Sequence, residues 1–93
     1  MTAALEQSET AILGRAINPA QASLTPEAAR SILDIKLTEA DAARRDELAE
    51  KAREGVLNSE ELNQLESYRH VGRILELVKA KARISLEKAK LAS

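Results

Sequence analysis

Residues 58–91 read NSEELNQLESYRHVGRILELVKAKARISLEKAKL. Written as one α-helix at 3.6 residues per turn, this stretch makes about nine turns. At about 100° per residue, its apolar side chains fall into two stripes on roughly opposite sides of the helix. The broad stripe holds Leu65, Tyr68, Val71, Leu75, Val78, Ala82, Leu86 and Ala89, and the second stripe holds Ile74, Leu77, Ile84 and Leu91. The broad stripe can pack against the protein's own shorter helices, so the second stripe requires another partner.

The residues just before this helix predict a tight turn between two antiparallel helices. Gly55 suits the left-handed position that follows a helix. Asn58 and Glu61 have the spacing of a capping box that starts the next helix, and Leu57 and Leu62 occupy the hydrophobic staple positions. The sequence therefore predicts a helical hairpin with a turn of about three residues.

Two shorter helices are expected earlier in the chain. Thr25 is a good N-cap residue and Pro26 suits the first helical position, so a helix should run from there to about Lys36. Thr38 begins a weaker capping motif, which predicts a helix over residues 39–54. Since no stretch alternates with period two, no strand is expected. The predicted fold class is all-α, a helical hairpin with two short helices packed on one long C-terminal helix.

The sequence predicts an N-terminal arm and one domain with a small apolar core. Residues 1–23 are expected to form a flexible or partly helical N-terminal arm, and residues 24–93 a single helical domain. The apolar share is 44%, but alanine supplies 17 of the 41 residues counted and Tyr68 is the only aromatic residue. Because so small a core stabilises a monomer weakly, self-association is expected.

Composition also indicates the cellular compartment in which the protein is expected. The chain has no cysteine, so it has neither a disulfide framework nor thiolate chemistry. No apolar run approaches the roughly 20 residues that span a bilayer. Residues 1–23 lack the basic start and continuous apolar stretch of a signal peptide. A cytoplasmic protein without membrane contact is expected.

Charge is unevenly distributed along the chain. Residues 1–68 carry 7 Lys and Arg against 13 Asp and Glu, whereas residues 69–93 carry 7 against 2. This polarity can steer binding to nucleic acid or to an acidic protein surface, although cations near a helix C-terminus also complement the helix dipole. The candidate nucleic-acid contacts are Lys79, Lys81, Arg83, Lys88 and Lys90. With no aromatic residue among them for base stacking, binding would be directed mainly at phosphates.

Residues that carry catalysis or bind metals are nearly absent from the sequence. His70 is the only histidine and is interpreted as a polar residue on the flank of the long helix. No Glu-x-x-His pair of the di-iron bundle type occurs, and Glu60 and Glu61 are explained by the positive end of the helix dipole. Gly72, unfavourable by about 1 kcal/mol in a helix interior, is interpreted as a packing contact under Leu33 or Leu48. No enzymatic activity, metal or cofactor is expected.

Five segments together resemble a known family. They are LTPEAAR from Leu24, EAD from Glu39, ELAEKAREG from Glu47, LESYRHVG from Leu65 and KARISL from Lys81. Over about residues 10–90 the chain resembles a family of short, uncharacterised, all-helical bacterial proteins. Members of that family are often encoded beside nucleases of the HNH type, which implies an antitoxin or immunity partner. Relatives tend to have an aromatic residue near Leu37, and this chain has none there.

These observations favour a small, non-catalytic protein–protein interaction module. The expected partner is a second copy, as a homodimer or higher oligomer, or another protein such as a nuclease. The candidate partner interface is the second stripe, Ile74, Leu77, Ile84 and Leu91. The alternative is a dimeric nucleic-acid-binding regulator that uses the basic C-terminal half.

Overall fold

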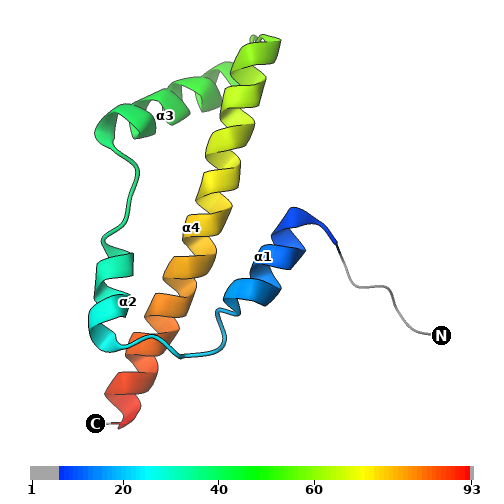
Figure 1. The fold of residues 1–93 in the computed structure, drawn as a ribbon. Coiled ribbons are helices and arrows are strands. Elements are labelled where there is room, and N and C mark those ends of the chain that lie inside the picture. The colour runs from blue at the N-terminus through cyan, green and yellow to red at the C-terminus, as the bar shows by residue number, and fades with distance from the viewer. Residues whose placement is uncertain (1–6, 93) are drawn as a thin grey trace, which may run out of the picture. The chain divides into compact units, whose positions relative to one another are not determined.

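The computed structural model describes residues 7–92, and within them it contains four helices and no strand (Figure 1). The helices are α1 (Glu9–Ile17), α2 (Pro26–Leu33), α3 (Glu39–Glu54) and α4 (Ser59–Ala92). The all-α class is confirmed, as is a long C-terminal helix contacted by the shorter ones. The part of the predicted N-terminal arm at residues 1–6 lies outside the described residues.

The chain divides into two compact units that share α4. One unit is Lys36–Arg73, which holds α3 and the beginning of α4. The other combines the residues up to Ile35 with those from Ile74 onward, and so holds α1, α2 and the rest of α4. Each unit therefore has its own set of packed side chains.

The turn in the unit Lys36–Arg73 ends α3 as the sequence predicts. Gly55 has a φ of +71°, in the left-handed region. Its N–H donates to the carbonyl of Ala52 over 3.1 Å, and the N–H of Val56 donates to the carbonyl of Lys51 over 3.0 Å. This pair of bonds is the Schellman motif, which satisfies carbonyls that the end of a helix leaves unpaired.

The start of α4 is a complete capping box. The Asn58 side-chain oxygen accepts the N–H of Glu61 over 2.8 Å, and Glu61 Oε1 accepts the N–H of Asn58 over 3.1 Å. Two backbone donors that would otherwise lack partners are thereby satisfied. The predicted hairpin turn is confirmed at both of its ends.

Leu48 and Leu65 form the apolar centre of this unit, with exposed fractions of 0% and 3%. Beside them the half-buried Tyr68 donates its hydroxyl hydrogen to Asp41 Oδ1 over 2.7 Å, and this bond raises the pKa of the tyrosine. Val71, placed by sequence in the packed broad stripe, is 40% exposed instead. The bond between Tyr68 and Asp41 joins the first turn of α3 to α4, so Val71, nearly one turn further along α4, lies beyond the start of α3.

Glu61 belongs to a polar network that the helix dipole alone does not account for. Its side chain is 11% exposed, forms an ion pair with Lys51, and lies 4.0 Å from Arg44 Nη2. Arg44 also donates two hydrogen bonds to Gln64 Oε1, of 2.9 and 3.2 Å. The hydrogen bond from Lys51 and the backbone N–H of Asn58 lower the pKa of Glu61. The carboxylate thus ties α3 to α4 next to the turn.

In the other unit, α2 begins as predicted and ends earlier. The Thr25 hydroxyl oxygen accepts the N–H of Ala28 over 3.2 Å. The helix stops at Leu33, because the N–H of Asp34 is shared between two carbonyls at 3.3 Å each and the regular pattern is lost. The predicted end near Lys36 is therefore wrong by about one turn. Ile35 lies beyond the helix and is 47% exposed.

Small side chains fill the centre of this unit. Ala29 on α2 and Ala82 on α4 are both 0% exposed, and Ser85 is 3% exposed. The Ser85 hydroxyl oxygen accepts the N–H of Leu24, just before α2, over 3.2 Å. Because methyl and hydroxymethyl groups take little space, the helix backbones can approach closely here.

No other segment packs closely against Gly72, which lies near the end of the unit Lys36–Arg73. A Cβ atom built there would meet no heavy atom within 4 Å. The interpretation of this glycine as a close contact under Leu33 or Leu48 is therefore wrong.

Among the described residues, no helix is both long enough and apolar enough to cross a membrane.

Candidate functional site

The four apolar residues of the second stripe differ in exposure along α4. Ile74 and Leu77 are half-buried, whereas Ile84 is 39% exposed and Leu91 is 84% exposed. All four belong to the unit that contains α1 and α2. The stripe is open to solvent mainly in its last two turns.

Helix α1 meets α4 on the side that carries Ile74 and Leu77. Lys81 Nζ donates to the carbonyl of Ile17, the last residue of α1, over 2.6 Å. At about 100° per residue, Lys81 lies on the same side of α4 as Ile74 and Leu77. In Figure 1, α1 and α2 lie on two sides of the C-terminal half of α4. The end of α1 thus lies beside the side of α4 on which Ile74 and Leu77 are half-buried, and the use of these two residues as a partner interface stays a prediction.

The local sequence explains where α1 ends. Asn18 has a φ of +48° and its N–H donates to the carbonyl of Gly14 over 2.9 Å, which is the left-handed cap of a helix. Pro19 follows and cannot continue the helix. The amine of Lys81 then meets the negative end of the α1 dipole. Lys81 thus has a structural partner, a role that the sequence analysis missed.

An open hollow lies between the α1–α2 connection and the last turns of α4. Its volume is about 500 Å³. Its lining residues are Ala20, Gln21, Ala22, Ile84, Glu87, Lys88 and Leu91. The two alanines leave space that larger residues would fill, and the exposed apolar residues of α4 border that space. The structure thus brings the exposed half of the second stripe together with a concave surface, which we call the apolar hollow.

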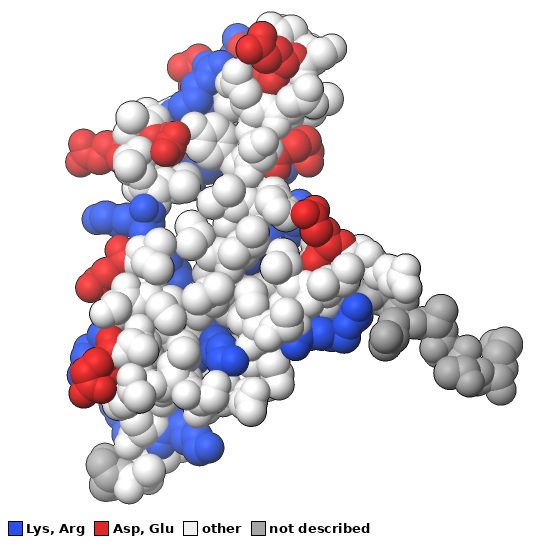
Figure 2. Space-filling model, viewed as in Figure 1, with Lys and Arg blue, Asp and Glu red and all other residues white. Residues whose placement is uncertain are grey.

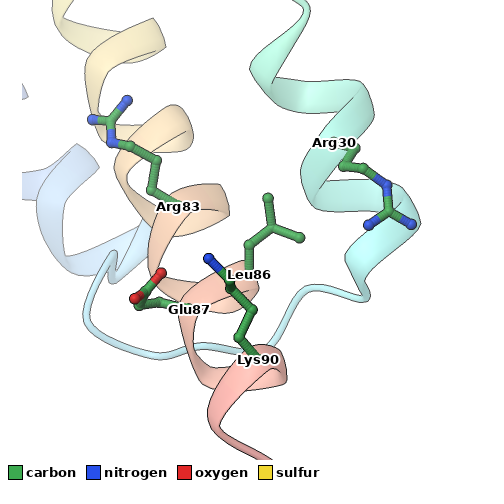
Figure 3. Close-up of a pocket in the computed structure, with 5 residues that line it drawn as sticks. All are labelled: Arg30, Arg83, Leu86, Glu87 and Lys90. Carbon is green, nitrogen blue, oxygen red and sulfur yellow. The ribbon is translucent and has the colours of Figure 1, made fainter. Parts of the chain in front are cut away.

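A second hollow, of about 480 Å³, lies between α2 and α4 (Figure 3). Its lining residues are Arg30, Arg83, Leu86, Glu87 and Lys90. In Figure 3, Leu86 extends from α4 toward α2, and Arg30 is the residue contributed by α2. Three cationic side chains against one carboxylate give this basic hollow a positive character. Arg30 could not be predicted from the sequence pattern, because it is distant from the other members along the chain.

Each of the two arginines of the basic hollow forms a long, exposed ion pair. Arg30 lies 3.9 Å from Glu27 and Arg83 lies 4.0 Å from Glu76. The two arginine side chains are 62% and 57% exposed. Exposed pairs at such distances contribute about 0–1 kcal/mol, so both guanidinium groups can turn to another anion at little cost.

The five predicted nucleic-acid contacts do not form one patch. Arg83 and Lys90 share the basic hollow, and Lys88 lines the apolar hollow. Lys81 is held by Ile17, and Lys79 is half-buried. On the face drawn in Figure 2, the blue side chains around α1, α2 and the end of α4 are scattered among uncharged and acidic side chains.

His70 is half-buried on α4. Among residues 7–92 no group of three or more His, Cys, Asp or Glu side chains is placed to hold a metal ion.

No known family model matches this chain, and no curated protein or solved structure shows significant similarity to it. The resemblance to the bacterial family found beside HNH-type nucleases stays a prediction.

Proposed function

We propose that this chain is a small, non-catalytic protein–protein interaction module of the cytoplasm. Its binding face is the last turns of α4, around Ile84 and Leu91, together with the apolar hollow. The observation that carries the proposal is the exposure of these side chains, 39% and 84%, beside a concave surface. Apolar side chains grouped at the surface of a soluble protein mark sites of interaction.

The partner in this proposal is a second copy of the chain, another protein, or both. The thin core supports self-association, because each unit buries few large apolar side chains. The resemblance to the bacterial family supports a role as an antitoxin or immunity partner of a nuclease. In either case binding would cover the apolar hollow and remove Leu91 from water.

Ile84→Asp is expected to abolish association at this face. A carboxylate placed in a desolvated apolar contact costs several kcal/mol. We expect the native chain to be a dimer or higher oligomer in light scattering at high micromolar concentration, and Ile84→Asp to be a monomer.

Val71→Asp is the matched control for this experiment. Val71 lies on the same helix, has nearly the same exposure at 40%, and belongs to the other unit. The Val71→Asp chain should therefore associate like the native chain. A native chain that is monomeric at high concentration, or equal effects of the two substitutions, would contradict self-association through this face.

Affinity capture tests whether this face binds a protein other than a second copy of the chain. A tagged native chain and its Ile84→Asp variant would be used for affinity capture, followed by mass spectrometry. A partner retained by the native chain and by Val71→Asp, and lost with Ile84→Asp, would support the proposal. If every captured protein binds all three chains equally, this face is not the binding site.

The basic hollow supports a second candidate function, binding to nucleic acid. Arg30, Arg83 and Lys90 come from two helices and line one concave surface, with the guanidinium groups of Arg30 and Arg83 on opposite sides of Leu86 in Figure 3. Each of them can contact a phosphate of a nucleic-acid backbone. For duplex DNA, the logarithm of the binding constant falls with the logarithm of the salt concentration at a slope of about −0.9 per phosphate contacted. With three such contacts, affinity should fall about 40-fold between 50 and 200 mM salt.

Neutralising this hollow tests the second candidate. In the variant Arg30→Gln, Arg83→Gln, Lys90→Gln, fluorescence anisotropy with labelled oligonucleotides should show loss of binding and of the salt dependence. The control neutralises three exposed cations of the other unit, namely Lys36, Arg45 and Arg53. Sub-micromolar binding at 150 mM salt that only the first variant loses would put nucleic acid ahead of protein binding. Equal loss in both variants would indicate nonspecific attraction.

A further inference from the structure

The apolar hollow and the basic hollow meet at Glu87, which lines both of them. At about 100° per residue, Arg83 and Lys90 lie on one side of Glu87 around α4. Ile84 and Leu91 lie on its other side. All five residues belong to the unit that contains α1 and α2. The end of α4 thus carries a basic surface and an apolar surface side by side, and a single ligand can cover both.

These adjoining surfaces have an excess of positive charge. Among the described residues that line them, one is the carboxylate Glu87 and the cations are Arg30, Arg83, Lys88 and Lys90. The side chains of Arg30 and Arg83 are 62% and 57% exposed, so a ligand can reach both guanidinium groups. A carboxylate matches a guanidinium group in shape as well as in charge, because it can accept two parallel hydrogen bonds from it. Charge complementarity therefore favours an acidic ligand.

Apolar side chains lie between and beside these cations. In Figure 3, Leu86 lies between the guanidinium groups of Arg30 and Arg83. Ile84 and Leu91 border the apolar hollow, about 10 Å apart along α4 at a rise of 1.5 Å per residue. A complementary ligand thus needs large apolar side chains as well as negative charge, within a length of about two helical turns.

A nucleic acid or a membrane matches this surface less well than a protein segment does. A nucleic-acid strand brings a phosphate about every 3.4 Å, so its charge would also fall on Glu87 and on the apolar side chains. Neither hollow is lined by an aromatic side chain on which a base could stack. A flat anionic bilayer would leave the concave parts of both hollows unfilled.

We propose that the two hollows together bind one acidic segment of another protein, in which Asp or Glu side chains flank large apolar ones. This inference rests on the proposed function and names the chemistry of its protein partner. The carboxylates of the segment accept hydrogen bonds from Arg30 and Arg83. Its apolar side chains cover Leu86, Ile84 and Leu91 and remove them from water.

Selection from a library of random peptides tests this chemistry without a known partner. Peptides about twelve residues long, enough for roughly three helical turns, would be displayed on phage and selected against the native chain at 150 mM salt. The enriched peptides should carry an excess of Asp and Glu beside Leu, Ile or Phe. Their affinities would then be measured by fluorescence anisotropy with the synthetic peptides.

Three variants show whether the charges act as proposed. Arg30→Glu, Arg83→Glu should weaken binding of the enriched peptides about tenfold or more, because like charges then face each other. The control Arg45→Glu, Arg53→Glu makes the same change of charge at exposed positions of the other unit and should leave binding unchanged. Glu87→Gln should tighten binding about two- to threefold, a gain that misfolding cannot produce.

Lack of enrichment, enriched peptides without an acidic excess, or equal losses in the two double variants would overturn the inference. Displacement of a bound peptide by duplex DNA, by vesicles of phosphatidylserine and phosphatidylcholine, or by further native chain, each at a lower concentration than unlabelled peptide requires, would assign the hollows to that occupant instead. If the enriched peptides are neutral and Ile84→Asp loses them, the inference is wrong and the proposed function stands. If no enriched peptide and no captured protein depends on Ile84, the proposed function is wrong as well.

Discussion

Leu48→Ala is expected to unfold the α3–α4 hairpin. Leu48 is the only large side chain on α3 that is fully buried, and the truncation would leave a cavity against Leu65. Truncations of this kind cost about 2–5 kcal/mol. The rest of α3 is alanine and charged residues, so no neighbouring side chain can fill the space. Urea melts followed by circular dichroism should show most of the stability of this unit lost.

Leu62→Ala is the control for that experiment. Leu62 is on α4 in the same unit and is 47% exposed, so its truncation should change the free energy of unfolding by about 0.5 kcal/mol or less. Similar losses for the two substitutions would mean that Leu48 does not form the centre of this hairpin.

Ala82→Leu is expected to separate α2 from α4 in the other unit. Ala82 is 0% exposed, and so is Ala29 on α2. Three additional carbon atoms have no space between helices that approach this closely, and overpacking of this kind costs about 1–3 kcal/mol. Nuclear magnetic resonance should show the amides of α2 shifted or lost, with those of α3 unchanged.

A substitution of alanine by leucine at an exposed position is the control for Ala82→Leu. Ala43 is exposed on α3, so Ala43→Leu should be close to neutral. If Ala82→Leu is equally neutral, the packing of α2 on α4 is looser than the burial of Ala29 and Ala82 indicates.

Local chemistry made the hairpin and the helix starts predictable from sequence. Gly55, Asn58 and Glu61 act through bonds that span three to five residues, so their spacing alone determines the geometry. Thr25 caps α2 for the same reason. The end of α2 was harder to predict, because no strong stop residue marks it.

The candidate site was less predictable, because it depends on contacts between distant segments. The second stripe was recognised by its periodicity, but the position of α1 on the same side of α4 is visible only through a bond between Lys81 and Ile17, 64 residues apart. A signal was present in the helical spacing of Ile12, Leu13 and Ile17 before Asn18. Arg30 was missed because it joins Arg83 and Lys90 only through the packing of α2 on α4.

Gly72 has a consequence for folding cooperativity. It lies one residue before the last residue of the unit Lys36–Arg73, so both units meet within α4 next to the residue with the weakest helix propensity in it. A Cβ atom at this position would meet no other heavy atom within 4 Å, so a methyl group there gains no close contact. The long helix is therefore expected to open most easily beside Gly72, so that each unit can unfold and refold as a separate cooperative segment.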